Sequence, residues 1–344
     1  MDKPVDEDQL GAATSAPARG YLYDAAGRDR EVEVTPEALE QLHDRAILWI
    51  DIPGRDAAEI ERVGALLQLD AVSVTALADP GASLRLDNYG VYLQFAALAA
   101  PDSSRAVEPG RRLNQDLRVD FVVGRNWVVT VHDQDVRYLR AFRGQDKADT
   151  ETGALSAAAL TASLLDWHLE GYFTEVSRIE AAVDEIDERI LAAPSEAGLL
   201  EGILSIRRRI SHLRRTLMAQ RSVFYGLSRP DMGQSTDGDA SAAFGSLSGR
   251  FERAVDEIEH TRDLIVGSFE LFTSRSAQQT NDLVKALTFF TVIIGSTAAV
   301  AGLFGMNFDP PFFRTGSIGF FAVTLGLFAL GLVAWVVGRK RRWI

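Results

Sequence analysis

The sequence predicts an α+β protein in which an N-terminal α/β domain is followed by a long helical stalk that continues into the first of two C-terminal transmembrane helices. Three observations predict this fold class. Strand-like and helical runs alternate up to about residue 150, helical periodicity dominates after it, and two uncharged apolar runs lie near the end of the chain. These runs, 286–304 and 316–338, each have the length of roughly 20 residues that a helix needs to cross a bilayer.

The first part of the chain has the mixed pattern of an α/β domain. Residues 1–18 are small and polar, and we expect them to be disordered. The α/β domain is expected over 19–150, where runs rich in β-branched and aromatic residues indicate strands and residues such as Ile60 and Val63 have helical spacing. The expected strands are 47–52, 91–99, 121–123 and 127–131, the last two forming a hairpin, and the expected helix is 56–69.

Region 151–280 is expected to form long cytoplasmic helices. One amphipathic segment spans 157–192 and ends before Pro194, and a second spans 199–227. A third begins near Gly249 and shows no helix breaker before the first apolar run, so it can continue into that run. A continuous helix of about 55 residues would be roughly 80 Å long. Such a rod would connect the cytoplasmic region to the membrane.

The first two stalk helices carry opposite charges. Acidic residues gather in 157–192, and arginines gather in 199–227. We expect an antiparallel hairpin with complementary charged faces. The alternative is that the acidic helix concentrates cations near the mouth of a pore.

Composition disfavours several classes of function. The net charge of −12 argues against nucleic acid as a partner, since phosphate binding needs basic patches. There is no cysteine, and the five histidines lack the spacing of a zinc site. We find no Ser/His/Asp arrangement and no phosphate-binding loop, so we expect neither an enzyme nor a resident cofactor.

Flanking charges predict the orientation in the membrane. The second apolar run is followed by Arg339-Lys340-Arg341-Arg342, whereas the segment between the runs carries only Arg314. Because basic residues stay on the cytoplasmic side, we expect a multi-pass protein of the cell (inner) membrane with both termini cytoplasmic. The alternative, two buried core helices of a soluble protein, is disfavoured by such long uncharged runs. The expected segments are the first span 281–304, an extracytoplasmic loop 305–315, the second span 316–338 and a basic cytoplasmic tail 339–344.

The first span has the residues of a pore lining. Two helices cannot enclose water, so a pore would need several copies in a closed ring. A ring of Asn281 would offer amide oxygens at the inner mouth, and a ring of Leu287 would form a hydrophobic constriction. Small residues also pack helices in proteins without pores. The residues that share one face at three- and four-residue steps are Asn281, Leu287, Thr288, Thr291, Gly295 and Ala298.

The tripeptide Gly305-Met306-Asn307 follows the first span. A ring of Asn307 would give neutral oxygens at the outer mouth, which suit a cation that keeps its water shell, as Mg2+ tends to do. The alternative is a simple helix C-cap in which Gly305 and Asn307 supply positive φ angles. Spacing alone leaves both interpretations open.

Several stretches together resemble the CorA family of divalent-cation transporters, with the ZntB-like zinc branch as a close relative. The resemblance covers nearly the whole chain after residue 20, and its most specific part is the GMN tripeptide between two terminal spans. The stretches are WIDI at 49–52, NWVVTVH at 126–132, LRR at 213–215 with QR at 220–221, NDLVKALT at 281–288, AGLFGMNF at 301–308 and RRWI at 341–344.

The resemblance implies a homopentamer with a long stalk helix that continues into the pore and passes Mg2+, often with Co2+ or Ni2+. It implies that Gly305, Met306 and Asn307 form the outer selectivity ring. It places Asn281 and Leu287 at the inner polar and hydrophobic rings. We expect no side chain to ligate a metal directly.

The chain departs from the family pattern at three places. Phe304 replaces the usual Tyr before the tripeptide. The acidic outer loop is missing, so attraction of cations outside depends on Asp309 and is opposed by Arg314. Thr75-Ala76 replaces a Glu-Asp pair that contributes to a Mg2+-sensing site in many members; Asp79 and Asp87 lie nearby in the sequence and could substitute. The pore is therefore expected to match the family better than the gate does.

Three functions follow as hypotheses. The first is a homopentameric, channel-like transporter of divalent cations, with Mg2+ favoured and Co2+ or Ni2+ as further substrates. The second is a ZntB-like Zn2+ transporter, with or without proton coupling. The third is a non-transporting, membrane-anchored metal sensor or adaptor. The expected partners are other copies of the chain, the lipid bilayer and the transported divalent ion.

Overall fold

The computed structural model describes residues 17–24, 29–40, 42–43, 46–101, 117–145, 156–229, 240–305 and 316–340. The chain divides into two compact units. The first unit comprises residues 1–183 and 204–265 and holds the sheet; the second comprises 184–203 and 266–344 and holds both apolar runs.

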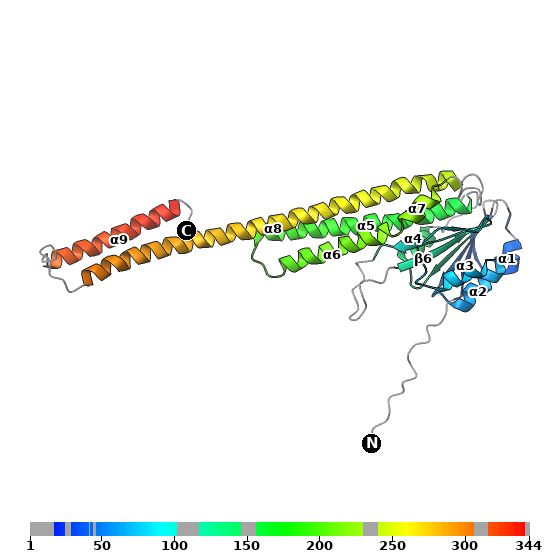
Figure 1. Ribbon diagram of the computed structural model, residues 1–344, viewed down its shortest axis with the longest axis horizontal. Coiled ribbons are helices and arrows are strands. Elements are labelled where there is room, and N and C mark those ends of the chain that lie inside the picture. The colour runs from blue at the N-terminus through cyan, green and yellow to red at the C-terminus, as the bar shows by residue number, and fades with distance from the viewer. Residues whose placement is uncertain are drawn as a thin grey trace, which may run out of the picture. The chain divides into compact units, whose positions relative to one another are not determined.

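The sheet of the first unit, which is drawn in Figure 1, has seven described strands. Their order is β2-β1-β3-β7-β6-β5-β4. The central pair β3 and β7 is parallel, with Ile50 opposite Val129, and every other neighbouring pair is antiparallel. The strands are β1 (Arg19–Asp24), β2 (Arg30–Val32), β3 (Ala46–Pro53), β4 (Asp87–Asn88), β5 (Leu93–Ala99), β6 (Leu117–Val123) and β7 (Trp127–His132).

The strands predicted from apolar runs are confirmed as β3, β5, β6 and β7. The predicted hairpin is also confirmed, because β6 pairs with β7. Its turn requires glycine: a Cβ on Gly124 would lie 2.3 Å from the ring of Trp127. Strand β3 is buried from Ala46 to Ile52, which is the pattern of a central strand covered on both faces.

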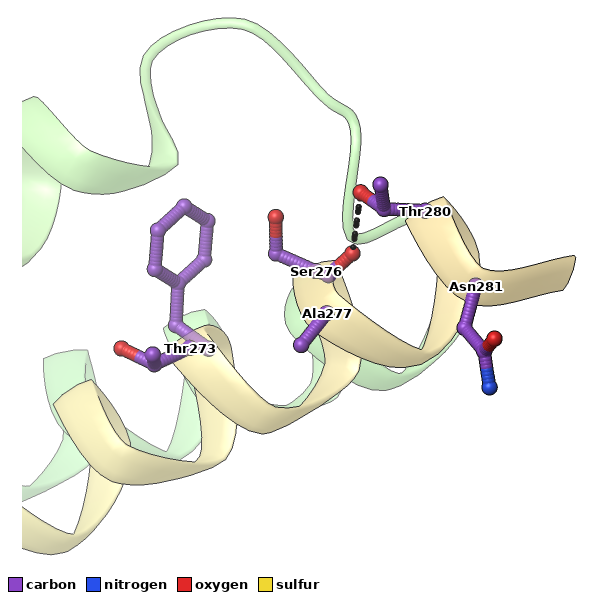
Figure 2. Close-up of a pocket in the computed structure, with 6 residues that line it drawn as sticks. Thr273, Ser276, Ala277, Thr280 and Asn281 are labelled. Carbon is purple, nitrogen blue, oxygen red and sulfur yellow. Dashed lines mark hydrogen bonds between the residues drawn. The ribbon is translucent and has the colours of Figure 1, made fainter. Parts of the chain in front are cut away.

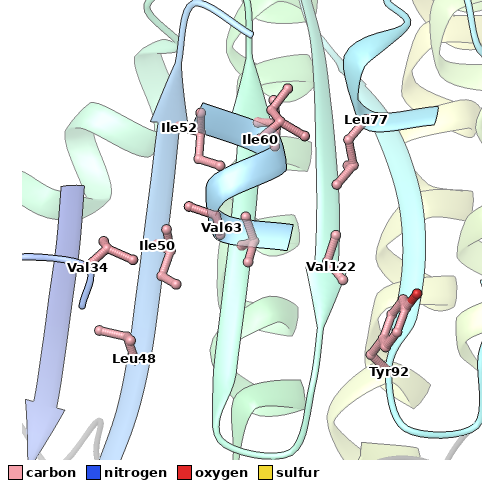
Figure 3. Packing of buried hydrophobic residues seen from close by; sticks show 11 residues of the cluster. Val34, Leu48, Ile50, Ile52, Ile60, Val63, Leu77, Tyr92 and Val122 are labelled. Atoms are coloured by element: carbon pink, nitrogen blue, oxygen red, sulfur yellow. The ribbon is translucent and has the colours of Figure 1, made fainter. Parts of the chain in front are cut away.

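Two short helices cover one face of the sheet. Helix α2 (Ala57–Leu66) begins at Asp56, whose side chain accepts a hydrogen bond from the backbone of Ala58, and α3 (Ala71–Ala78) begins in the same way at Asp70. The predicted helix over 56–69 is thereby confirmed. Figure 3 shows its apolar face against the strands. The core residues there include Ile60, Val63, Leu77, Leu48, Ile50, Ile52, Val122, Val129 and Val131. Two further helices of this unit are α1 (Pro36–Glu40) and α4 (Arg137–Gln145).

The first long helix, α5 (Ala157–Ala192), has the predicted bounds. The single helix predicted over 199–227 is wrong, because the chain forms α6 (Leu199–Met218) and α7 (Arg221–Leu227) with a turn between them. At this turn the buried side chain of Gln220 donates to the carbonyl of Leu98 at 3.0 Å and accepts from its amide at 2.9 Å. The break thus attaches the helices to β5, and no Gly or Pro marks it in the sequence.

The predicted charge pairing between the first two long helices is present. Arg209 of α6 donates to Glu175 of α5 at 2.9 Å. Other charges pair elsewhere: Arg214 of α6 pairs with Glu259, and Arg250 pairs with Glu170 of α5. Both of these additional partners lie on the helix that follows α7. The arginines therefore connect three helices, not two.

That third helix, α8 (Ala240–Gly305), is continuous over 66 residues, or about 100 Å at 1.5 Å per residue. The predicted run of the stalk into the first apolar segment is confirmed, but the helix begins at Ala240 and not near Gly249. Phe244, Leu247 and Phe251 are buried, so packing holds this early part helical despite its glycines. Helix α9 (Gly316–Lys340) holds the second apolar run.

Helices α8 and α9 each contain a stretch long and apolar enough to cross a membrane. None of the most apolar stretch of either helix is buried within the described part of the chain. The core helices of a soluble protein would be mostly buried. The alternative of two soluble core helices therefore loses its support.

Candidate functional site

The predicted pore-lining residues all lie on α8 and are exposed. Leu287, for example, is 68% exposed although its side chain is apolar. A second set of residues in the same part of the helix is only partly exposed. That set is Ala286, Phe289, Ile293, Thr297 and Val300.

The two sets lie on opposite sides of α8. Successive residues of an α-helix are about 100° apart around its axis. On that spacing, the predicted pore-lining residues centre about 180° from the partly buried ones. Figure 1 shows α9 running alongside this part of α8. Residues of α9 at helical spacing are partly buried as well, namely Val323, Leu327, Gly331 and Ala334. Helix α9 thus accompanies one side of α8 and leaves the predicted face uncovered.

The hydroxyl groups on the uncovered face have a defined orientation. Thr288 donates its hydroxyl hydrogen to the carbonyl of Val284 at 2.8 Å, and Thr291 donates to the carbonyl of Leu287 at 2.8 Å. Each hydroxyl hydrogen is used within the helix, so the oxygen lone pairs remain for other donors. The water shell of a cation presents hydrogens outward. This face is therefore chemically suited to a hydrated cation.

The uncovered face carries no formal charge from Ser276 to Gly305. The only charged residues in that stretch of the sequence are Asp282 and Lys285. Their side chains bond to each other at 2.9 Å and lie outside the face defined above. Any attraction for cations here comes from neutral oxygens.

A hollow of about 520 Å³ lies on α8 immediately before the first apolar run. Figure 2 shows its lining, with Thr280 donating to the carbonyl of Ser276 at 2.9 Å. Thr273 likewise donates to the carbonyl of Phe269 at 2.9 Å. The lining residues are Phe272, Thr273, Ser276, Ala277, Thr280 and Asn281.

The hollow extends the predicted face toward the stalk. Thr273, Ala277 and Thr280 continue the helical spacing of Asn281 and Thr288, and together these positions and Ala298 span about 40 Å. Sequence reasoning stopped at Asn281 and missed the earlier members. The signal was present, since small and hydroxylated residues recur at the same three- and four-residue steps.

The outer end of the predicted site is described only in part. Gly305 is the last residue of α8 and is exposed. Met306, Asn307 and the outer-mouth residue Asp309 lie outside the described residues. The predicted selectivity ring and outer-mouth charge stay predictions.

The positions of the family's sensing pair carry no clustered acids. Thr75 is exposed on α3 and donates to the carbonyl of Ala71 at 2.8 Å, beside the half-buried Ala76. The two acidic residues that could substitute for the family's pair bond to nearby residues. Asp79 accepts from the amide of Gly81 at 2.8 Å, and Asp87 pairs with Arg85 at 2.7 Å. Among the described residues, no group of three or more His, Asp or Glu side chains could hold a metal ion.

Sequence reasoning missed a buried polar network at the sheet. Asp51 of β3 accepts from Thr130 at 2.6 Å and from Arg143 of α4 at 3.2 Å, and it lies 3.1 Å from Nε2 of His132. Burial alone would raise the pKa of Asp51. The hydrogen bonds from His132 and Thr130 and the charges of His132 and Arg143 outweigh burial and lower that pKa.

A second buried network joins α3 to the strands. Arg55 donates to Asp120 at 2.7 Å and to the carbonyl of Leu77 at 2.6 Å, and Arg118 donates to Asp120 at 2.6 Å. Arg55 has a φ of 47°, an uncommon value for a residue with a side chain. These hydrogen bonds and ion pairs hold Arg55 in that backbone conformation. The partners are far apart in the sequence, so no local pattern could indicate them.

Comparison with known proteins gives one family. The sequence pattern of the family described as CorA-like Mg2+ transporter protein matches residues 44–341. A cobalt/magnesium transport protein CorA from Thermotoga maritima is 24% identical over 367 residues, covering 99% of this chain and 100% of that protein.

Solved structures share the fold. The complete structure of the CorA magnesium transporter from Methanocaldococcus jannaschii superposes with a TM-score of 0.70 at 17% identity and covers 96% of this chain and 99% of that one. The ZntB cytoplasmic domain from Vibrio parahaemolyticus gives a TM-score of 0.57 at 8% identity, with 76% of this chain and all of that domain covered. The predicted fold class and the resemblance to both branches are confirmed.

Proposed function

Since this chain belongs to the CorA-like Mg2+ transporter family, we propose that five copies form a channel-like pore that moves divalent metal cations, Mg2+ in preference, across the cell membrane. Co2+ and Ni2+ are proposed as further substrates. An interior-negative potential contributes about 2.3 kcal/mol per charge per 100 mV, hence about 4.6 kcal/mol for a dication entering the cell. Such a gradient is sufficient to drive uptake without nucleotide hydrolysis.

The observation that carries this proposal is the uncovered face of α8. Its threonine hydroxyls direct their hydrogens into the helix, which leaves oxygen acceptors on the side opposite the partly buried residues. In a ring of five copies, these faces would surround a neutral, oxygen-lined path. Mg2+ gives up its waters reluctantly. A path that accepts ions with their water shell in place therefore favours Mg2+.

Two further elements of the proposal concern control of the path. Leu287 is exposed on the same face, and a ring of five would form a constriction that closes by excluding water. Asn307 and Gly305 would form the outer ring. The hollow around Thr273 and Thr280 would continue the path into the stalk.

The proposed orientation keeps both termini in the cytoplasm. Arg339 and Lys340 end α9, and the guanidinium of Arg339 lies 5.5 Å from the ring of Trp335. A tryptophan beside basic residues suits the membrane interface. The proposed location is the inner membrane of the cell.

A second candidate is a Zn2+ transporter of the ZntB-like branch. The features that favour it are Thr75-Ala76 in place of an acidic pair and the engagement of Asp79 and Asp87 in local contacts. Without an acidic site on α3, closure by Mg2+ would lack its usual ligands. Zinc transport would not need that closure.

Flux in liposomes tests the proposal. We expect liposomes with the purified full-length chain to take up Mg2+, and we expect Asn307→Ala to abolish uptake while the oligomer still assembles. Ser317→Ala, at the start of α9, is the matched control and should transport normally. Zinc uptake that depends on a pH gradient, with no Mg2+ uptake, would select the second candidate. Liposomes impermeable to every dication would leave only a sensor or adaptor.

A further inference from the structure

A cavity of about 220 Å³ lies in the first unit, between α4, the ends of β5 and β6, and α5. It involves none of the residues of the α8 face. Much of its wall is small or apolar, and the aromatic residues Tyr138, Trp167 and His168 also line it. The apolar and small lining residues include Ala99, Pro101, Leu117, Val136, Ala141 and Gly171.

Two buried polar atoms of residues that line this cavity have no hydrogen-bond partner among the described residues: the hydroxyl of Tyr138 and Nδ1 of His168. Their residues are only 7% and 1% exposed. The two rings meet edge to face with centroids 5.4 Å apart. An unsatisfied buried polar atom is costly, and two of them beside one cavity indicate a bound partner.

The hydrogen-bond network defines what His168 can accept. Gln220 uses its amide nitrogen to donate to the carbonyls of Leu98 and Thr216, both at 3.0 Å, so its oxygen is the atom 3.1 Å from Nε2 of His168. Nε2 therefore carries the hydrogen, and Nδ1 presents a lone pair. Burial also lowers the pKa of His168 to about 4, so the ring is neutral at neutral pH. A ligand must donate to it.

Three acidic residues and three arginines line the cavity, and five of these six form ion pairs within the protein. Arg140 pairs with Asp135 at 2.9 Å. Glu175 accepts from Arg209 at 2.9 Å and lies 3.5 Å from Arg178. An ionic ligand would find no free opposite charge among these pairs and would lose its hydration on burial. The cavity favours an uncharged ligand.

We propose that this cavity binds a small uncharged molecule with an apolar body and a primary amide or similar group that offers an N–H donor beside an acceptor oxygen. The donor bonds to Nδ1 of His168, and the acceptor takes the hydrogen of the Tyr138 hydroxyl. The apolar body packs against Pro101, Val136 and Trp167. This binding is independent of the proposed transport and links the sheet to α4 and α5.

Benzamide and acetophenone test the donor requirement, because they share the ring, the carbonyl and the overall shape, and only benzamide carries N–H groups. Binding of each to the purified full-length protein is measured by saturation-transfer NMR. We expect benzamide to bind about tenfold more tightly, the effect of leaving a buried acceptor unpaired.

Tyr138→Phe and Tyr89→Phe form the matched pair of variants. Tyr138→Phe should weaken benzamide binding severalfold without lowering the unfolding temperature, because the hydroxyl has no partner among the described residues. Tyr89→Phe, at a half-buried tyrosine away from the cavity, should leave binding unchanged. Equal affinity for the two probes, no binding of either, or benzamide binding unaffected by Tyr138→Phe would overturn the proposal.

Discussion

The sheet-containing unit and the apolar part of α8 use polar side chains in opposite ways. In the first, Asp120 is 1% exposed and is held between Arg55 and Arg118. In the second, Thr288 and Thr291 are exposed, and each donates to a carbonyl of its own helix. Buried polar groups tie distant segments together, whereas exposed ones leave their oxygens available to something outside the chain.

The difference follows from the cost of burial. A charge taken out of water must be paired, and removing its partner leaves an uncompensated buried charge. Replacing an exposed threonine that bonds to its own helix leaves no buried charge unpaired. We therefore expect substitutions in the two regions to separate stability from transport, and three predictions test that separation.

The largest effect is expected at Asp120. Asp120→Ala would leave the buried guanidinium groups of Arg55 and Arg118 without their shared carboxylate. We expect a loss of about 3–5 kcal/mol in the free energy of unfolding, the range for breaking a buried ion pair. Denaturant unfolding of the purified protein measures it.

Asp87→Ala is the control for that prediction. Asp87 pairs with Arg85 at 2.7 Å, but the Arg85 side chain is 61% exposed. Exposed ion pairs contribute about 0–1 kcal/mol. Similar losses of unfolding free energy for Asp120→Ala and Asp87→Ala would show that burial does not increase the contribution of the Asp120 ion pairs to stability.

The next effect is a pH dependence of stability that originates at Asp51. Its pKa is lowered from 3.8 in the folded protein, so its charged form stabilises the fold above the unfolded pKa. That contribution is lost as the pH falls through the lower, folded pKa. We expect Asp51→Asn to cost about 2 kcal/mol at pH 7, the scale of hydrogen bonds to a charged group.

Below about pH 4 the difference between wild type and Asp51→Asn should shrink, because the carboxylate of the unfolded chain then takes up a proton while that of the folded protein is still charged, and the difference is lost as the pH falls through the lower, folded pKa. Unfolding temperatures of both proteins at pH 7 and pH 3 provide the measurement. A difference that stays constant over this range would mean that the charge of Asp51 does not stabilise the fold.

Local patterns in the sequence were sufficient for elements whose structure depends on nearby residues. Strand β3 follows from its continuous apolar run, and α5 from its unbroken helical spacing. The turn at Gln220 could not be predicted, because the bonds that hold it go to Leu98, far away in the sequence. Arg55 and Asp120 are 65 positions apart, so their pairing depends on the folded sheet.

The candidate face of α8 lies between these cases. Three- and four-residue spacing predicted which residues share a side, including Asn281 and Thr291. Which side is left uncovered depends on where α9 lies, and that information is absent from the pattern. The spacing also continued to Thr273, where sequence reasoning did not follow it.

The smallest effect is expected for a single hydroxyl on the uncovered face. Thr291→Val keeps the shape of the side chain and removes one oxygen acceptor per copy, and Thr297→Val makes the same change on the partly buried side. We expect the first to lower Mg2+ uptake severalfold, about 1 kcal/mol for a lost hydrogen bond, with the second near wild type. Neither should change the unfolding temperature of the sheet-containing unit, because neither hydroxyl belongs to it. Equal uptake by the two variants would mean that the face opposite the partly buried residues does not line the path of the ion.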